Sequence, residues 1–151
     1  MQEFAIASTT TRAMWVVALI PIVVMLLASV LLWATVTGAR SARFEISPDG
    51  LRLRGDLWGR SIPLNQLDIA AATRIDLASS PELTPTRRTM GTGLPGYQSG
   101  WFRLRNGEQA LLYLTDRTRA VYVPTRAGYS LLLSPAEPDR FVAALRAASG
   151  R

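Results

Sequence analysis

The pattern of hydrophobic and polar positions changes once along this chain, close to residue 41. Residues 13–39, AMWVVALIPIVVMLLASVLLWATVTGA, are apolar or small and carry no charge. A helix of that length spans about 40 Å at 1.5 Å per residue, whereas the hydrocarbon core of a bilayer is about 30 Å thick. The pattern therefore predicts a transmembrane helix over residues 13–39, preceded by a short N-terminal tail of residues 1–12.

Two tryptophans strengthen the membrane interpretation. Trp15 and Trp33 lie near the two ends of the apolar run, and indole rings are enriched at membrane interfaces. We therefore expect both to act as interface anchors. A cleaved signal peptide is the main alternative, because Thr37 and Ala39 are small residues with the spacing of a cleavage site, but the apolar run is much longer than a signal peptide requires.

After Ser41 apolar and polar residues alternate with a period of two, which is typical of β-strands. The alternation predicts a hairpin over residues 43–54 whose turn is Ser47-Pro48-Asp49-Gly50. A short strand is predicted at residues 60–64. A longer strand is predicted at residues 69–77, although three consecutive alanines there also suit a helix.

The middle of the domain has a different character. Residues 79–99 contain three prolines and several glycines without periodicity, which predicts a long loop that enters the next strand at Gly100. Asn106-Gly107 then indicates a tight hairpin. Two further strands are predicted at residues 120–124 and 129–133.

The chain closes with a predicted helix over residues 135–148. Ser134-Pro135-Ala136-Glu137 combines a capping serine, a proline at the first helical position and a glutamate three residues after the cap. Phe141, Leu145 and Ala148 form one apolar stripe at helical spacing, which we expect to pack against the sheet.

Composition excludes several chemistries. The chain has no Cys and no His, and all 17 basic residues are Arg. Thiol nucleophiles, imidazole bases, disulfides, Schiff-base lysines and Cys/His zinc sites are therefore impossible. No metal or other cofactor is expected. The formal charge of +6 suits an anionic partner such as a membrane surface, or simply a solvated basic surface.

The segment Gly91-Thr92-Gly93-Leu94-Pro95-Gly96 matches the letters of a dinucleotide-binding loop. Such a loop requires a buried strand before the glycines and a helix that opens on them. Polar residues precede the glycines here and strands follow them, so we interpret the match as accidental.

Three segments of the sequence resemble those of the bacterial pleckstrin-homology-like domain family, whose members are often tethered to membrane spans. They are Arg43-Phe44-Glu45-Ile46, the glycine segment from Gly91 to Tyr97 with Gly100-Trp101-Phe102, and the helix from Ser134-Pro135 to Leu145. The resemblance covers residues 42–148. It implies a mainly β fold, a partly open barrel of about seven antiparallel strands in two near-orthogonal sheets, plugged by the C-terminal helix. It also implies a protein that is not an enzyme.

Four arginines are candidate contacts for an anionic ligand. Arg52 and Arg54 stand where lipid-binding relatives in the wider family carry basic residues, but this chain lacks Lys, has Asp56 beside the pair and has a short turn. Arg87 and Arg88 are the other candidates, for an anionic headgroup or an acidic partner. A solvated charge pair is the simpler interpretation of both.

Several functions remain in competition. The leading hypothesis is a membrane-anchored interaction module that binds a protein partner, and the alternative is an anionic-lipid-binding domain that uses surface arginines. The scattered carboxylates give no spacing typical of an enzyme. Trp101, Tyr113 and Tyr122 could stack on bases, but aromatic residues on strands usually pack in the core, and we expect no nucleic-acid partner.

The flanking charges predict orientation. Only Arg12 precedes the apolar run, whereas four arginines follow it closely: Arg40, Arg43, Arg52 and Arg54. Because basic residues favour the cytoplasmic side, we expect a single-pass protein of the cell membrane whose C-terminal domain is cytoplasmic.

Overall fold

A computed structural model describes residues 11–55 and 57–150, and the side chains of all of these except 11–14 and 35–41. The predicted tail of residues 1–12 lies largely outside this range, as does Asp56. The chain divides into two compact units, Met1–Thr37 and Gly38–Arg151, which are described separately.

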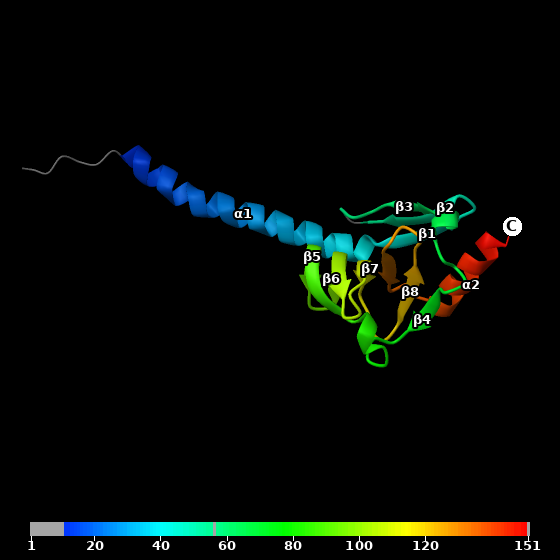
Figure 1. Cartoon of the computed structure of the whole chain (residues 1–151). Coiled ribbons are helices and arrows are strands. Elements are labelled where there is room, and N and C mark those ends of the chain that lie inside the picture. The colour runs from blue at the N-terminus through cyan, green and yellow to red at the C-terminus, as the bar shows by residue number, and fades with distance from the viewer. Residues whose placement is uncertain (1–10, 56, 151) are drawn as a thin grey trace, which may run out of the picture. The chain divides into compact units, whose positions relative to one another are not determined.

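The first unit contains most of one long helix, α1 (Thr11–Ser41), which is drawn in blue to cyan in Figure 1. Its segment Trp15–Ala34 is long and apolar enough to cross a membrane, and none of that segment is buried within the protein. Pro21 lies inside the helix, which membrane helices tolerate. The Ser29 hydroxyl donates a hydrogen bond to the Met25 carbonyl (2.8 Å), so this polar group is satisfied without a partner from outside the helix.

The second unit begins with a three-stranded antiparallel sheet in the order β1-β2-β3. Its strands are β1 (Arg43–Ser47), β2 (Gly50–Arg54) and β3 (Ser61–Pro63). The predicted hairpin and its Pro48-Asp49 turn are confirmed, because Ser47 pairs with Gly50. Gly50 is required where β2 and β3 approach closely, since a Cβ there would collide with the Ile62 carbonyl.

A six-stranded sheet follows, in the order β4-β8-β9-β7-β6-β5. Neighbouring strands are antiparallel except β7 and β9, which are parallel. The strands are β4 (Thr73–Ile75), β5 (Pro85–Leu94), β6 (Tyr97–Leu104), β7 (Gln109–Leu114), β8 (Ala120–Pro124) and β9 (Ser130–Leu133). The described residues thus form nine short strands instead of about seven, and the prediction that all pairs are antiparallel is wrong for β7 and β9.

Two short 3-10 helices, η1 (Leu64–Gln66) and η2 (Pro81–Leu83), and the closing helix α2 (Pro138–Ser149) complete the unit. One core cluster lies between the two sheets and α2, and includes Leu51, Leu131 and Leu145. A second cluster lies on the opposite face of the six-stranded sheet, where Leu77 and Leu83 contribute to it from the β4–β5 connection. Because both faces of β7 are covered, residues 110–114 are all buried.

The predicted loop over residues 79–99 is wrong for most of its length. β5 and β6 are a hairpin joined by a turn at Pro95-Gly96, so the second strand begins at Tyr97 and not at Gly100. Every side chain of β5 is exposed or half-buried. The strand therefore carries no apolar alternation, which is the signal on which the strand predictions depended.

Two other boundaries differ. The predicted strand over residues 69–77 is reduced to β4, because Ala72 N–H donates to the Ile69 carbonyl (3.2 Å) in a turn. The closing helix begins at Pro138, not Pro135, and no side chain caps it. A helix from Pro135 would place Pro138 where its ring clashes with the preceding turn, and a residue before proline disfavours helical geometry. Glu137 accordingly has φ −123° and ψ 84°.

The capping box predicted at Ser134 is wrong for the same reason. The Ser134 hydroxyl instead donates to the Asp116 carbonyl (2.9 Å) and accepts from the Asp116 N–H (3.3 Å). It therefore ties the end of β9 to the β7–β8 connection. The apolar stripe of the helix is confirmed, since Phe141 and Leu145 are buried in the first cluster.

Candidate interaction surfaces

The outward face of the three-stranded sheet is basic. Arg52 and Arg54 are exposed on β2, and Arg43 lies opposite Arg54 on β1. Glu45 is the one carboxylate among them and lies 3.6 Å from the Arg54 guanidinium. Both partners of that ion pair are about half exposed, so the pair contributes little to stability. Two of the four predicted contact residues, Arg52 and Arg54, thus lie on one face. Arg43, which was not predicted as a contact, lies on the same face.

The other two predicted contacts lie on a different sheet. Arg87 and Arg88 are exposed on β5, where Arg87 pairs with Arg103 and Arg88 with Phe102. Successive side chains of a strand point to opposite faces, so Arg87 and Arg88 do not form one charged patch. The structure therefore does not bring the four arginines into a single site.

The glycine segment lies in the β5–β6 hairpin. Gly91 pairs with Gly100, and a Cβ added to Gly100 would lie 2.5 Å from the Gly91 Cα. No helix opens on these glycines, since β6 follows the turn directly. The interpretation of the dinucleotide match as accidental is confirmed, and the glycines serve close contact between two strands.

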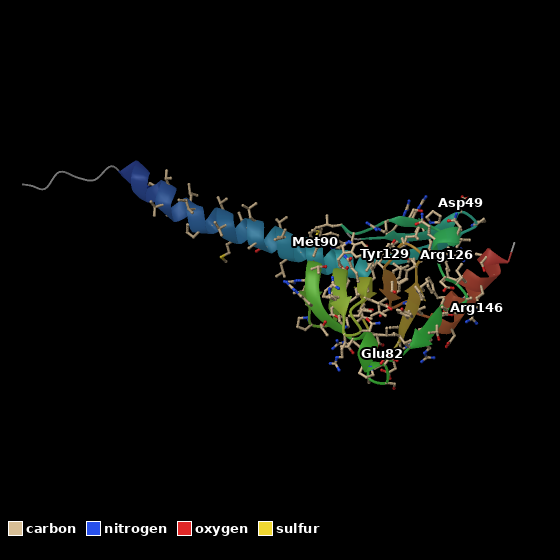
Figure 2. All side chains as sticks on the ribbon, viewed as in Figure 1. Asp49, Glu82, Met90, Arg126, Tyr129 and Arg146 are labelled. Carbon is tan, nitrogen blue, oxygen red and sulfur yellow. The ribbon has the colours of Figure 1, made fainter. Side chains whose placement is uncertain are left out.

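An aromatic and cationic surface lies at the side of the six-stranded sheet. The Trp101 and Tyr129 rings meet edge to face with centroids 5.1 Å apart, and the Arg60 guanidinium lies 5.0 Å from the Trp101 ring centre. Met90 is the neighbour of Trp101 across β5 and β6 and is 59% exposed. Figure 2 labels Met90 and Tyr129. These four residues are named the Trp101 surface.

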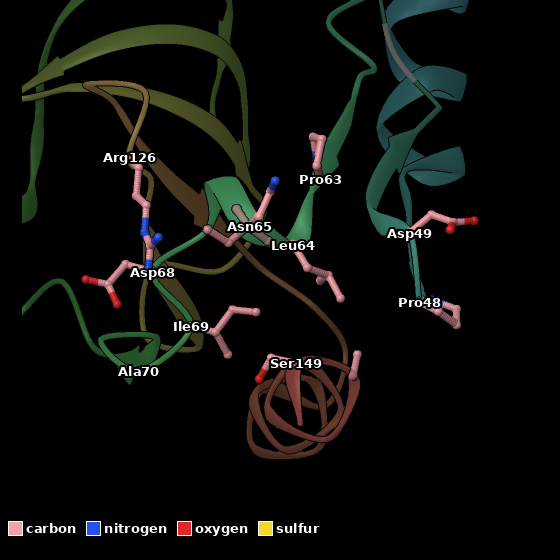
Figure 3. Close-up of a pocket in the computed structure, with 12 residues that line it drawn as sticks. Pro48, Asp49, Pro63, Leu64, Asn65, Asp68, Ile69, Ala70, Arg126 and Ser149 are labelled. Carbon is pink, nitrogen blue, oxygen red and sulfur yellow. The ribbon is translucent and has the colours of Figure 1, made fainter. Parts of the chain in front are cut away.

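A groove of about 580 Å³ opens at the end of the domain where α2 finishes. Figure 3 shows Leu64 and Ile69 facing it, with Ser149 of α2 opposite. Asp49, Asp68 and Arg126 lie at its margin, so its charge is mixed. No convergent set of polar groups lines this groove, and it gives no indication of a particular ligand.

A smaller hollow of about 340 Å³ lies where β2 ends. It is lined by Arg52, Arg54, Gly55, Gly59, Arg60 and Ser61 with Leu53. The adjoining residues were not identified from the sequence: Leu57 is 94% exposed, whereas Trp58 is half-buried against the first core cluster. In the sequence, the one indication of these residues was the apolar pair Leu57-Trp58 between Gly55 and Gly59.

The side chains of Tyr122, Ser130 and Glu108 form a hydrogen-bonded group that resembles catalytic machinery but has a structural role. The Tyr122 and Ser130 hydroxyls each donate to the same Glu108 carboxylate oxygen, at 2.9 and 3.0 Å. The pKa of Tyr122 is raised, mainly by burial and also by the neighbouring Glu108 carboxylate, while the hydrogen bond with Ser130 acts in the opposite direction. The three residues tie β8 and β9 to the start of β7, and Ser130 is 4% exposed. A nucleophile needs an accessible hydroxyl, and the Ser130 hydroxyl is buried.

Within residues 11–55 and 57–150, no three acidic side chains come close enough to hold a metal ion. Tyr113 and Tyr122, which the sequence offered for base stacking, contribute instead to the two core clusters. Trp101 is half-buried and remains available at the surface.

The comparison with protein families completes the assignment. A model of the bacterial PH domain matches residues 42–149. Neither the curated proteins nor the solved structures contain a match. Together with a mainly β unit of two open sheets and a closing helix, the match confirms the resemblance and the fold class expected from the sequence. The chain belongs to the bacterial PH domain family.

Proposed function

We propose that this protein is a membrane-anchored, non-enzymatic interaction module that binds a protein partner through the Trp101 surface. The observation that carries the proposal is that the half-buried rings of Trp101 and Tyr129, which pack against the first core cluster, contact each other and lie beside the exposed side chains of Arg60 and Met90. Trp, Tyr, Arg and Met are the residue types enriched at protein interfaces, and Trp, Tyr and Arg are the commonest energetic hot spots.

The neighbouring sheet edge supports a protein partner. β5 is the edge strand of the six-stranded sheet, and an exposed edge can accept an extended peptide as an additional strand. Register shifts separate Pro85 from Arg87 and Arg88 from Met90, and such bulges discourage unspecific pairing. Residues 90–94 are regular. A peptide that paired there would place alternate side chains beside Met90, the neighbour of Trp101 across β5 and β6.

The membrane helix supplies the location. An anchored domain meets membrane neighbours at a raised effective concentration, so a modest interface suffices for binding. The arginines that follow the apolar run favour a cytoplasmic domain in this proposal.

Catalysis is not part of the proposal. Three residue types that often act as activated nucleophiles or bases, Cys, His and Lys, do not occur in the chain. The hydroxyl of Ser130 is buried and bonded to Glu108.

The test is site-specific photocrosslinking in intact membranes. The full chain carries a photoreactive phenylalanine analogue in place of Met90, and a matched variant carries it in place of Ala143, which is exposed on α2. The expected result is a discrete protein adduct from position 90 and none from position 143. Equal labelling from both positions, or no protein adduct from position 90, would contradict the proposal.

A further inference from the structure

The face of the β5–β6 hairpin that carries Trp101 also carries two opposed arginines. Arg87 of β5 pairs with Arg103 of β6, and both side chains are exposed. Because alternate residues of a strand share a face, Arg103 lies on the same face as Trp101, whose neighbour on β5 is Met90. Like charges directly opposite each other destabilise a strand pair. The hairpin therefore holds two positive charges together beside the Trp101 surface, although this arrangement lowers its own stability.

Arg88 and Arg60 are assigned to opposite faces of the hairpin by their contacts. Arg88 pairs with Phe102, a residue of the second core cluster, and thus lies on the face away from Trp101. The Arg60 guanidinium lies 5.0 Å from the Trp101 ring centre, so Arg60 shares the face of Trp101. The arginines of this face are Arg60, Arg87 and Arg103.

No carboxylate among residues 11–55 and 57–150 forms an ion pair with these three arginines. The ion pairs of the described side chains belong to Arg54, Arg74 and Arg140. The Arg103 guanidinium donates instead to the neutral Gly107 carbonyl (2.9 Å). Glu108 follows in the same turn, but its carboxylate accepts from Tyr122, which packs against the second core cluster on the other face of the sheet. The positive charge beside Trp101 is therefore left for a partner to neutralise.

The contacts of Trp101 favour a protein segment over a nucleic acid as that partner. Base stacking needs a free aromatic face, whereas the Trp101 ring packs against the first core cluster, meets Tyr129 edge to face and lies under Arg60. The adjoining part of β5, residues 90–94, is uncharged, regularly paired with β6 and at the edge of the sheet. Such an edge can form backbone hydrogen bonds with an extended peptide.

We propose that the partner of the Trp101 surface presents an extended acidic segment, which pairs with residues 90–94 and places carboxylates against Arg87 and Arg103. This inference rests on the proposed function and names the chemistry of its partner. A carboxylate can accept two parallel hydrogen bonds from one guanidinium, and a negative charge between the two arginines relieves their repulsion.

The strand geometry also gives the pattern of the segment. Met90 and Leu94 share a face by alternation and are 59% and 39% exposed. An antiparallel segment that runs from Leu94 toward Arg87 would contact these two side chains first and the arginines afterwards. The expected pattern is therefore two apolar residues four positions apart, followed by acidic residues.

Peptide titration of the full chain in detergent micelles tests the inference. The probe is a short synthetic peptide with two valines four positions apart and two glutamates after them, and a matched peptide carries glutamines in place of the glutamates. The readout is the amide chemical shift of Gly91, Thr92 and Gly93. The glutamate peptide should give saturable shifts, and the glutamine peptide should bind about tenfold more weakly, or about threefold for each ion pair lost. High salt should reduce this difference.

Substitution of the two opposed arginines supplies the second half of the test. Arg87→Gln combined with Arg103→Gln should remove the preference for glutamate. Arg117→Gln is the matched control, because Arg117 is exposed and follows the end of β7, whereas Arg103 pairs with Gln109 at the start of β7. The control should retain the preference of about tenfold.

Equal binding of the two peptides, no shift with the glutamate peptide, or the same loss in the Arg117→Gln control would overturn the inference. Saturable shifts with an oligothymidylate or a short-chain phosphatidylglycerol, but not with the peptide, would assign the surface to nucleic acid or to lipid. Crosslinking from Met90 separates this inference from the proposed function. A protein adduct without a preference for the glutamate peptide overturns the acidic segment alone, whereas the lack of any protein adduct overturns the binding function itself.

Discussion

At the scale of single residues, the glycine segment serves the packing of two strands. Gly91 and Gly100 face each other across β5 and β6, with φ of +144° and +109°. A Cβ on Gly100 would lie 2.5 Å from both the Gly91 Cα and the Met90 carbonyl oxygen. Both contacts are with backbone, which cannot move aside without distorting the hairpin.

Gly100→Ala should therefore be much more destabilising than a glycine substitution that only forces a positive φ. Gly128→Ala is the matched control, because its φ is +85° and no atom lies within 4 Å of the added Cβ. We expect the control to cost about 1 to 2 kcal/mol and Gly100→Ala about 1 to 3 kcal/mol more. Denaturant unfolding of the full chain in detergent measures both, and equal losses would contradict the close approach.

Asp116 gives the fold a dependence on acid pH. Hydrogen bonds from the Thr118 hydroxyl (2.7 Å) and the Thr118 N–H (2.9 Å) stabilise its carboxylate and lower its pKa. A group whose pKa is lower in the folded state contributes stability above its unfolded pKa, and this contribution is lost as the pH falls through the folded value. The loss should begin below about pH 4.

Asp116→Asn tests this contribution, because an Asn oxygen can still accept the Thr118 N–H but does not titrate. Other carboxylates titrate equally in both proteins. The free energy of unfolding of the unsubstituted protein should therefore fall more steeply with acid than that of the variant. Parallel curves between pH 5 and pH 2 would show that the hydrogen bonds do not shift the titration of Asp116.

At the scale of elements, sequence patterns predicted the strands that bury apolar side chains on at least one face. They did not predict β5, which has no fully buried side chain. The first core cluster receives apolar side chains from β1, β2, β8 and β9. These strands were therefore predictable from the alternation of apolar residues or from short apolar runs. β5 is an edge strand with no fully buried side chain. Its position depends on backbone pairing with β6, and backbone pairing leaves no residue pattern in the chain.

The helix start was predicted wrongly because two prolines, Pro135 and Pro138, could each begin the helix. Ser134-Pro135 satisfies a local capping rule, whereas Pro138 satisfies the rule that proline occupies the first helical turn. Only one start is compatible with both prolines. The structure selects Pro138, and Ser134 is free to bond with Asp116.

Ser134→Ala distinguishes these two roles. In the structure Ser134 bonds only to the backbone of Asp116 among its described side-chain contacts, so its loss should cost about 1 to 2 kcal/mol without loosening α2. Amide hydrogen exchange should accelerate at Asp116 and stay unchanged in the first turn of α2. Faster exchange of residues 139–142 instead would restore the capping interpretation.

At the scale of the whole molecule, the sequence indicated the family and the membrane segment but not the surfaces. The Trp101 surface joins Arg60 before β3, Met90 on β5, Trp101 on β6 and Tyr129 before β9. No local pattern connects four positions spread over such a length of chain. Of the four arginines predicted as ligand contacts, Arg52 and Arg54 lie together, while Arg87 and Arg88 belong to another sheet.

The orientation of the whole chain is the remaining prediction. One arginine precedes the apolar run and four follow it closely, and translocating those four across a membrane is disfavoured. Fusion of two reporters to the C-terminus tests it: a fluorescent protein that matures only in the cytoplasm should be bright, and a phosphatase that is active only after export should be silent. Replacing Arg40 and Arg43 by Gln removes two of the four flanking charges and should raise the exported fraction. A dark fluorescent fusion with an active phosphatase would place the domain outside the cell, where neither a cytoplasmic partner nor the anionic inner leaflet is available to it.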